Sequence, residues 1–151
     1  MAPRYFTLAQ AQALLPHVRT MLGSALQLHA HLRRKLATLQ DHGVDIDWPA
    51  LRGQTAPETQ DEFTRDELGR ARGIYATLRE LITELESSGV ELKSVTNGLV
   101  DFPSWCDGER EVLLCYRLGD ADITHFHGLE DDFEARVSIE GHEFTNGPSA
   151  L

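Results

Sequence analysis

The residues that could carry chemistry are concentrated between Asn97 and Phe133, where two histidines stand two positions apart. His125 and His127 would point to the same face of a β-strand, because side chains alternate along a strand. Glu130 follows His127 by three residues. Two imidazoles and a carboxylate can hold a divalent ion such as zinc, iron or manganese. We therefore treat this segment as a candidate metal site.

Three further residues are candidate ligands of the same ion. Asp101 and Glu111 are expected on neighbouring strands, and His17 begins a long helix at the end of the hairpin where the sheet starts. A His-x-His pair also occurs by chance and is not an established metal spacing. The alternative is that His127 is hydrogen-bonded to a carboxylate while His125 is exposed on an edge strand.

The pairing of the strands decides which face these histidines occupy. The expected hairpin turn at 119–122 places His125 opposite Tyr116 and His127 opposite Leu114. A slip of one residue would move both histidines to the other face, because side chains have a period of two.

Arg117 and Cys115 lie in the strand with the strongest pattern. A buried arginine needs a partner, and Asp101 is the expected carboxylate. The alternative is that Arg117 receives an anionic ligand or cofactor. Cys115 has no activating base assigned to it, so we predict an unreactive thiol.

A long helix must position this segment. Thr7 and Gln10 have the spacing of a capping box, which predicts a helix from Leu8. Pro16 is expected to interrupt or kink it, because proline lacks an N–H and clashes with the preceding turn. Gly43 is expected to end the helix in the left-handed conformation. The apolar seam is spaced by three and four residues and comprises Leu15, Val18, Leu22, Ala25, His29, Leu32, Leu36 and Leu39.

A loop over 43–58 and a second helix over about 59–87 follow, and Gly89 is the expected stop. Gly69 and Gly73 share one helical face and would let another helix approach closely. Two helices alone would leave much of their apolar stripes exposed. We therefore expect a homodimer that forms a four-helix bundle, with cover from the sheet as the alternative.

The period then changes to that of β-structure. We predict an α+β fold, with one domain over residues 1–151. It would consist of a long antiparallel helical hairpin at about 7–88, a small C-terminal antiparallel β-sheet at about 90–136 and a frayed tail at about 140–151. The expected strands are 90–93, 99–102 (ended by Pro103), 111–118 and 123–127.

Charge is distributed unevenly. Residues 97–151 carry 12 acidic and 3 basic side chains, a net charge of −9, whereas the preceding residues carry 12 and 11, a net charge of −1. Such a segment would repel a phosphate backbone, which argues against nucleic-acid binding, and it suits a cation or a basic protein partner. No apolar run has the length of a membrane span, and the first residues lack the pattern of a signal peptide. We therefore expect a cytoplasmic protein.

Several motifs, in the same order, resemble a bacterial domain family of unknown function, numbered 2203. Tyr116 and His125 depart from the pattern of that family, whereas Asp101, Arg117 and His127 fit it. The resemblance implies a small cytoplasmic protein with no assigned reaction. It covers about residues 5–136 and rests on Tyr5–Leu8, Leu14–Pro16, Gly89–Lys93, Gly98–Pro103, Arg110–Val112, Cys115–Gly119, His127 and Phe133.

Three functions remain open at this point. The first is a small protein that binds a divalent metal through His127, Glu130 and neighbouring acids. The second is a non-catalytic dimeric helical module whose acidic end binds a partner. The third is a metal-assisted hydrolase that uses the same cluster.

Overall fold

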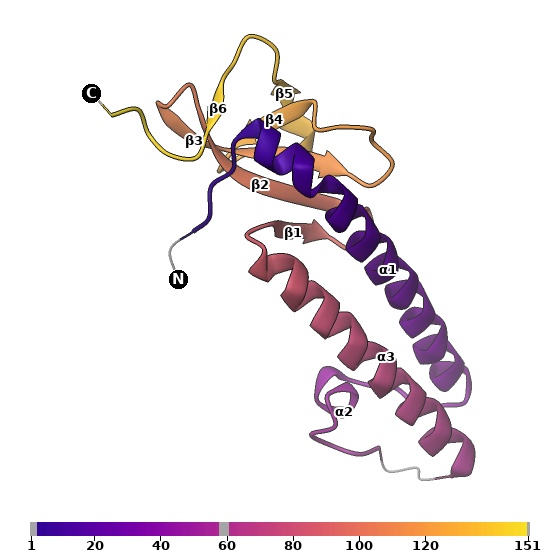
Figure 1. Ribbon diagram of the computed structural model, residues 1–151. Helices are drawn as coiled ribbons and strands as arrows, with labels where there is room; N and C mark the ends of the chain where they lie inside the picture. Colours follow the sequence, from indigo (N-terminus) through magenta and orange to yellow (C-terminus); the bar gives the residue numbers. More distant parts are fainter. Residues whose placement is uncertain (1–2, 58–60, 151) are drawn as a thin grey trace. The chain divides into compact units, whose positions relative to one another are not determined.

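The computed structural model describes residues 3–57 and 61–150 and has two long helices followed by an antiparallel six-stranded sheet (Figure 1). The predicted α+β fold is therefore confirmed. The chain divides into two compact units. We call Ser24–Ile82 the hairpin unit, and we call the residues up to Gly23 together with those from Thr83 the sheet unit. The single-domain organisation over residues 1–151 stays a prediction.

Helix α1 (Leu8–Asp41) begins at the predicted capping box. The Thr7 N–H donates to Gln10 Oε1 at 2.9 Å, and the Gln10 N–H donates to Thr7 Oγ1 at 3.1 Å. The expected interruption at Pro16 is wrong, because the helix continues through it. Pro16 is exposed. Its ring therefore removes one backbone hydrogen bond without disturbing the buried face of the helix.

The end of α1 follows the prediction at Gly43, which has a φ of 82°. The Val44 N–H donates to the Leu39 carbonyl at 2.9 Å, which is the long bond of a Schellman motif. The segment expected to be a loop contains a short helix, α2 (Trp48–Leu51), because the Asp47 side chain caps its first turn.

Helix α3 (Glu62–Ser87) begins after Asp61, whose carboxylate accepts the Thr64 N–H at 2.7 Å. The predicted start near Thr59 lies outside the described residues. In the hairpin unit, Lys35 Nζ lies 3.0 Å from Glu67 Oε2 and so links α1 to α3. The apolar residues buried in this unit are Ala25, Leu32, Leu39, Val44, Ala50, Leu51, Leu68, Ala71 and Leu78. None of the helices in the described residues is long and apolar enough to cross a membrane.

The sheet has the order β1-β2-β3-β4-β5, with β6 also paired to β2. All of its ladders are antiparallel. The 3-10 helix η1 (Phe133–Ala135) lies between the fourth and fifth strands. The strands are β1 (Glu91–Ser94), β2 (Leu99–Cys106), β3 (Arg110–Arg117), β4 (His125–Gly128), β5 (Val137–Ser138) and β6 (Phe144–Thr145).

Strand β2 is longer than predicted because Pro103 does not end it. The Pro103 carbonyl accepts the Phe6 N–H at 2.8 Å, and the Ser104 hydroxyl donates to the Phe6 carbonyl at 2.6 Å. The tail is also more ordered than predicted. Phe144 is buried and lies opposite Cys106 in the β2–β6 ladder.

The two faces of the sheet differ in character. One face is apolar and carries the buried residues Val100, Phe102, Val112, Leu114, Tyr116 and Phe126. The first part of α1 packs against this apolar face. There, Arg19 Nε donates to the Tyr116 hydroxyl at 3.1 Å. The Gln12 side chain also accepts the Ile123 N–H at 3.1 Å. The opposite face carries several of the residues predicted to do chemistry, among them Asp101, His125 and His127.

Candidate functional site

Asp101 on β2 and His127 on β4 meet on that second face. His127 Nε2 lies 3.3 Å from Asp101 Oδ1, and the two residues are 5% and 3% exposed, respectively. Strand β3 separates their strands, and its Leu113 is the cross-strand partner of His127. Two residues named as ligands from the sequence are thus brought together in the core of the sheet unit.

The register differs from the prediction by one residue. Cys115 lies opposite His125 and Leu113 lies opposite His127, in place of the expected Tyr116 and Leu114. The reason is that Ile123 does not return as a strand residue, because its backbone is hydrogen-bonded to the side chain of Gln12. The histidines consequently lie on the face of the sheet opposite the helix-covered core.

The His127 ring contacts the backbone as well as Asp101. His127 Nδ1 lies 2.9 Å from the Gly128 carbonyl, which can only accept, so Nδ1 carries a hydrogen. Burial raises the pKa of Asp101, and the charges of His127 and Lys93 oppose this rise.

The second carboxylate oxygen of Asp101, Oδ2, is buried and has no hydrogen-bond partner. Asp101 and His127 also line a cavity of about 280 Å³. An unpaired buried oxygen costs free energy, because it has lost its water without gaining a donor. The other lining residues are Lys93, Leu99, Leu113, Leu129, Asp131, Asp132 and Phe133.

The other predicted metal ligands do not line this cavity. His17 and Glu130 are exposed, the former on α1 and the latter after β4. His125 Nδ1 lies 2.8 Å from the Thr124 hydroxyl. Glu111 accepts a hydrogen bond from Tyr5, whose pKa is raised first by burial and then by this carboxylate.

Arg117 is exposed, so the expectation of a buried arginine paired with Asp101 is wrong. Its guanidinium lies 5.5 Å from the centre of the Phe133 ring, and that of Arg136 lies 3.9 Å from the same ring. These contacts attach η1 to the sheet. Cys115 is buried, and burial raises the pKa of its thiol to about 12, in agreement with the predicted unreactive thiol.

A second cluster lies at the far end of β2 and unites Cys106, Asp107 and His142. Cys106 Sγ is 3.6 Å from His142 Nδ1 and 3.5 Å from Asp107 Oδ2. His142 Nδ1 is 2.8 Å from Asp107 Oδ2. Among the described residues, this is the group in which three donor atoms of metal-ligand type all lie within 4.8 Å of one another.

A tight turn and the tail together build this cluster. Asp107 and Gly108 have φ values of 56° and 69°, and the Glu109 N–H donates to the Cys106 carbonyl at 3.0 Å. Positive φ at both central residues is the signature of a type I′ hairpin turn. The Asp107 N–H donates to the Glu143 carbonyl at 2.7 Å, which brings the tail and His142 beside the turn.

The electrostatics of the cluster differ between its thiol and its carboxylate. Burial raises the pKa of Cys106, and the neighbouring Asp107 adds to this rise. The pKa of Asp107 is lowered, first by the hydrogen bond from the Glu143 backbone and then by His142. The cluster thus contains a carboxylate beside a protonated thiol, and a cation would have to displace the proton of that thiol.

Sequence reasoning missed this cluster because His142 was placed in a frayed tail. The missing information was the pairing of β6 with β2, since a two-residue strand gives almost no periodic signal.

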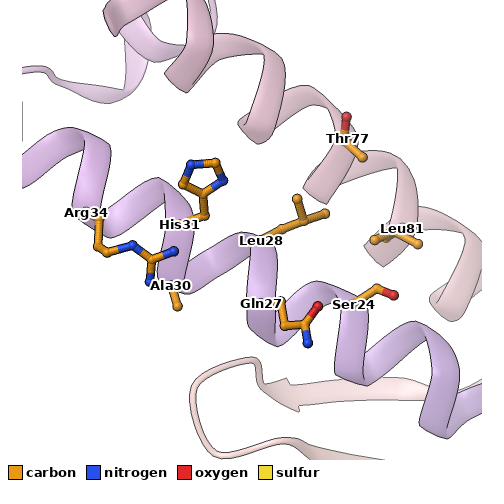
Figure 2. A pocket seen from close by; sticks show the side chains of 8 residues that line it. All are labelled: Ser24, Gln27, Leu28, Ala30, His31, Arg34, Thr77 and Leu81. Atoms are coloured by element: carbon orange, nitrogen blue, oxygen red, sulfur yellow. The ribbon is translucent and has the colours of Figure 1, made fainter.

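A larger cavity, of about 730 Å³, lies in the hairpin unit between α1 and α3 (Figure 2). It is an open groove, and Leu28 of α1 and Leu81 of α3 contribute apolar surface to it. His31 is the histidine among its lining residues. The groove suits a hydrophobic contact better than chemistry.

Residues 4–139 match the family described as an uncharacterized conserved protein, DUF2203. The chain belongs to this family. Searches of curated proteins and of solved structures gave no match.

The family match contains all of one candidate site and only part of the other. Asp101 and His127 both lie within the residues that match DUF2203, as do Cys106 and Asp107. His142 lies three positions beyond the last matched residue, 139. The cavity pair is therefore contained in the DUF2203 region, whereas the three-residue cluster needs the segment that follows it.

Proposed function

We propose that this protein binds a divalent ion of the zinc class through Cys106, Asp107 and His142. The observation that carries the proposal is the triangle formed by the three donor atoms, with edges of 2.8, 3.5 and 3.6 Å. In a tetrahedral zinc site with bonds of about 2.0 to 2.3 Å, neighbouring ligand atoms lie roughly 3.3 to 3.6 Å apart. Only the edge between His142 and Asp107 would have to lengthen.

The chemistry of the donors favours zinc over magnesium or calcium. A thiolate and an imidazole are softer ligands than the all-oxygen sets that the latter two ions prefer. Asp107 and His142 are exposed, so water can occupy the fourth position. That arrangement is typical of catalytic zinc sites, and it is the arrangement that the metal-assisted hydrolase hypothesis requires.

The proposed ligands are not the residues that the sequence predicted to bind a metal. Asp101 and His127 are in contact, but His17, Glu111, His125 and Glu130 contribute nothing to their cavity. Free thiols are typical of reducing compartments, which fits the proposed cytoplasmic location. Both cysteines are free in the structure.

Titration with Co²⁺ and Zn²⁺ tests the proposal. We expect one Co²⁺ per chain with a thiolate-to-cobalt charge-transfer band, displaced by Zn²⁺. Cys106→Ser and His142→Ala should remove the band and weaken binding by about 100-fold or more, since even the partners of metal ligands contribute 10- to 100-fold. Cys115→Ser is the matched control and should bind as the wild type does. Binding that survives Cys106→Ser, or is absent from the wild type, contradicts the proposal.

A homodimer that joins the hairpin units is the second proposal, and the glycine pair of α3 favours it. Gly69 and Gly73 are exposed, and a Cβ added to either would meet no atom within 4 Å. Among the described residues, none covers this face of α3, so a helix from another chain could approach it. Light scattering of the wild type should give twice the chain mass, and Gly73→Leu should shift it to one chain mass. A monomeric wild type at micromolar concentration contradicts this proposal. A basic protein partner for the acidic segment 97–151 remains a further proposal.

A further inference from the structure

The cavity beside Asp101 and His127 has the features of a built binding site. Asp101 lines it, and the Oδ2 oxygen of this residue is buried without a hydrogen-bond donor. The side chain of Asp101 is 5% exposed, and its other oxygen is already engaged by His127 at 3.3 Å. A ligand that brings an N–H group would supply the missing donor.

The walls of the cavity define the body of the ligand. Leu99, Leu113, Leu129 and Phe133 give it apolar sides. The volume of about 280 Å³ lies just below the range of about 300–1,000 Å³ that drug-sized ligands occupy. The cavity therefore suits a compact molecule with one apolar ring or short chain.

The charges around the cavity define the head of the ligand. Asp101, Asp131 and Asp132 contribute carboxyl groups, and Lys93 contributes the one amine among the lining residues. Carboxyl groups thus outnumber amines among the lining residues, and this excess of acidic groups favours a cation.

The loop that closes the cavity is fixed by its own hydrogen bonds. The Gly128 N–H donates to Asp131 Oδ2 at 3.2 Å, and the Asp131 N–H donates to the Gly128 carbonyl at 3.1 Å. A Cβ on Gly128 would lie 2.8 Å from Asp131 Oδ2. The carboxylate of Asp131 is therefore held in place before any ligand arrives, which lowers the entropy cost of binding.

We propose that this cavity binds a small organic ammonium ion, with its N–H groups on Asp101 Oδ2 and its apolar body against Leu113 and Phe133. His127 is a positioning residue, because it holds Oδ1 of Asp101 and leaves Oδ2 free. The site is separate from the proposed metal cluster and uses none of its residues.

Three probes that share an aromatic ring test which head group the cavity prefers: benzylamine, benzyl alcohol and benzoate. Binding is measured by calorimetry and by the shifts of the His127 ring nitrogens in NMR spectra. We expect benzylamine to bind at least tenfold more tightly than the alcohol, because a hydrogen bond to a charged group is the stronger kind, and benzoate not to bind. Equal binding of amine and alcohol, preference for benzoate, or no binding of any probe overturns the proposal.

Variants locate the binding. Asp101→Asn removes the charge and should weaken benzylamine by about tenfold or more. Leu129→Trp is a second test that leaves the carboxylate intact, since residue 129 is 51% exposed and lines the cavity. The added bulk should block binding without disturbing the core. Glu130→Gln is the matched control, because it removes a neighbouring charge outside the cavity, and it should bind normally. Wild-type affinity in both Asp101→Asn and Leu129→Trp overturns the proposal.

Cys106→Ser distinguishes this site from the metal cluster. It should abolish the cobalt band and leave benzylamine binding unchanged. Loss of benzylamine binding in this variant would overturn the assignment of the amine to the Asp101 cavity.

Discussion

Asp101 is a residue whose burial opposes stability. Its pKa is raised mainly because the carboxyl has lost water, with His127 and Lys93 only partly compensating. When the pKa of a carboxyl is higher in the folded than in the unfolded chain, its contribution to stability is fully present below the unfolded pKa of about 3.9. That contribution is lost as pH rises through the folded pKa. A buried site held ready for a ligand is expected to carry such a cost.

Asp101→Asn should therefore become more stable, relative to the wild type, as pH rises above about 4. The asparagine amide can donate to His127 Nε2 while His127 Nδ1 continues to donate to the Gly128 carbonyl. We expect a gain on the order of 1 kcal/mol in the free energy of unfolding at pH 7, measured by urea denaturation between pH 4 and 8. A variant that is less stable by the same amount at every pH would show that the contact with His127 outweighs the burial of the charge.

Asp107 combines a role in the turn with a proposed role as a metal ligand, and substitution by asparagine separates the two. Its φ of 56° is left-handed, a conformation that asparagine adopts readily. In the wild type, Asp107 Oδ1 accepts the Glu143 N–H at 2.8 Å. Asp107→Asn keeps an oxygen that can accept the same hydrogen bond. We expect the melting temperature to change little and the affinity for Zn²⁺ to fall by about tenfold or more. Unchanged zinc affinity would remove Asp107 from the ligand set.

At the scale of elements, the start of α1 can be tested directly. Thr7→Ala removes the hydroxyl that accepts the Gln10 N–H, and loss of such a cap costs about 1 kcal/mol. Thr20→Ala is the matched control, because the Thr20 hydroxyl donates only to the carbonyl of its own helix at Pro16. Chemical denaturation should show the loss in the first variant alone. Equal effects would mean that the capping box does not stabilise the helix.

Elements with local signals were predictable from the sequence. The capping residues and Gly43 fixed both ends of α1, because a hydroxyl acceptor and a glycine at positive φ act within one turn. Pro16 was misjudged, since a single missing hydrogen bond is tolerated where the packing of the helix continues. The register of β4 depended on Ile123, whose partner Gln12 stands 111 residues away, and no local pattern encodes such a contact.

The candidate sites also differ in whether local sequence signals were enough to predict them. Asp101 and His127 were identified because the His-x-His spacing places both histidines on one face of a strand, and Asp101 was expected on a neighbouring strand. His142 was not, because its position depends on β6, which comprises only Phe144–Thr145. The cavity itself depends on how η1 folds back over the sheet, through the contacts of Phe133 with Arg117 and Arg136.

At the scale of the whole molecule, strand β2 organises the sheet unit. One of its edges is paired with β3 along its full length. The other edge is shared by β1 at its start and β6 at its end, with the Phe6 backbone between them. Segments from widely separated parts of the sequence thus meet on one strand.

Removal of residues 140–151 tests the contribution of the tail. We expect a lower melting temperature, because Phe144 is 5% exposed and its burial would be lost. The shortened chain should also lose Co²⁺ binding, since His142 is removed, and it should keep benzylamine binding. Phe144→Ala is the matched control, because it removes the burial and keeps His142. An unchanged melting temperature in both variants would mean that β6 contributes nothing to the fold.

The shared edge of β2 also has a consequence for self-association. Without the tail, Trp105 would lose its cross-strand partner Thr145, and the Asp107 N–H would lose the Glu143 carbonyl. The open strand edge that results is a template for addition of a strand from another chain. A chain cut where the family match ends, at residue 139, would carry such an edge and should tend toward aggregation. The family match therefore ends inside the compact sheet unit, and an expression boundary for this protein belongs beyond Thr145.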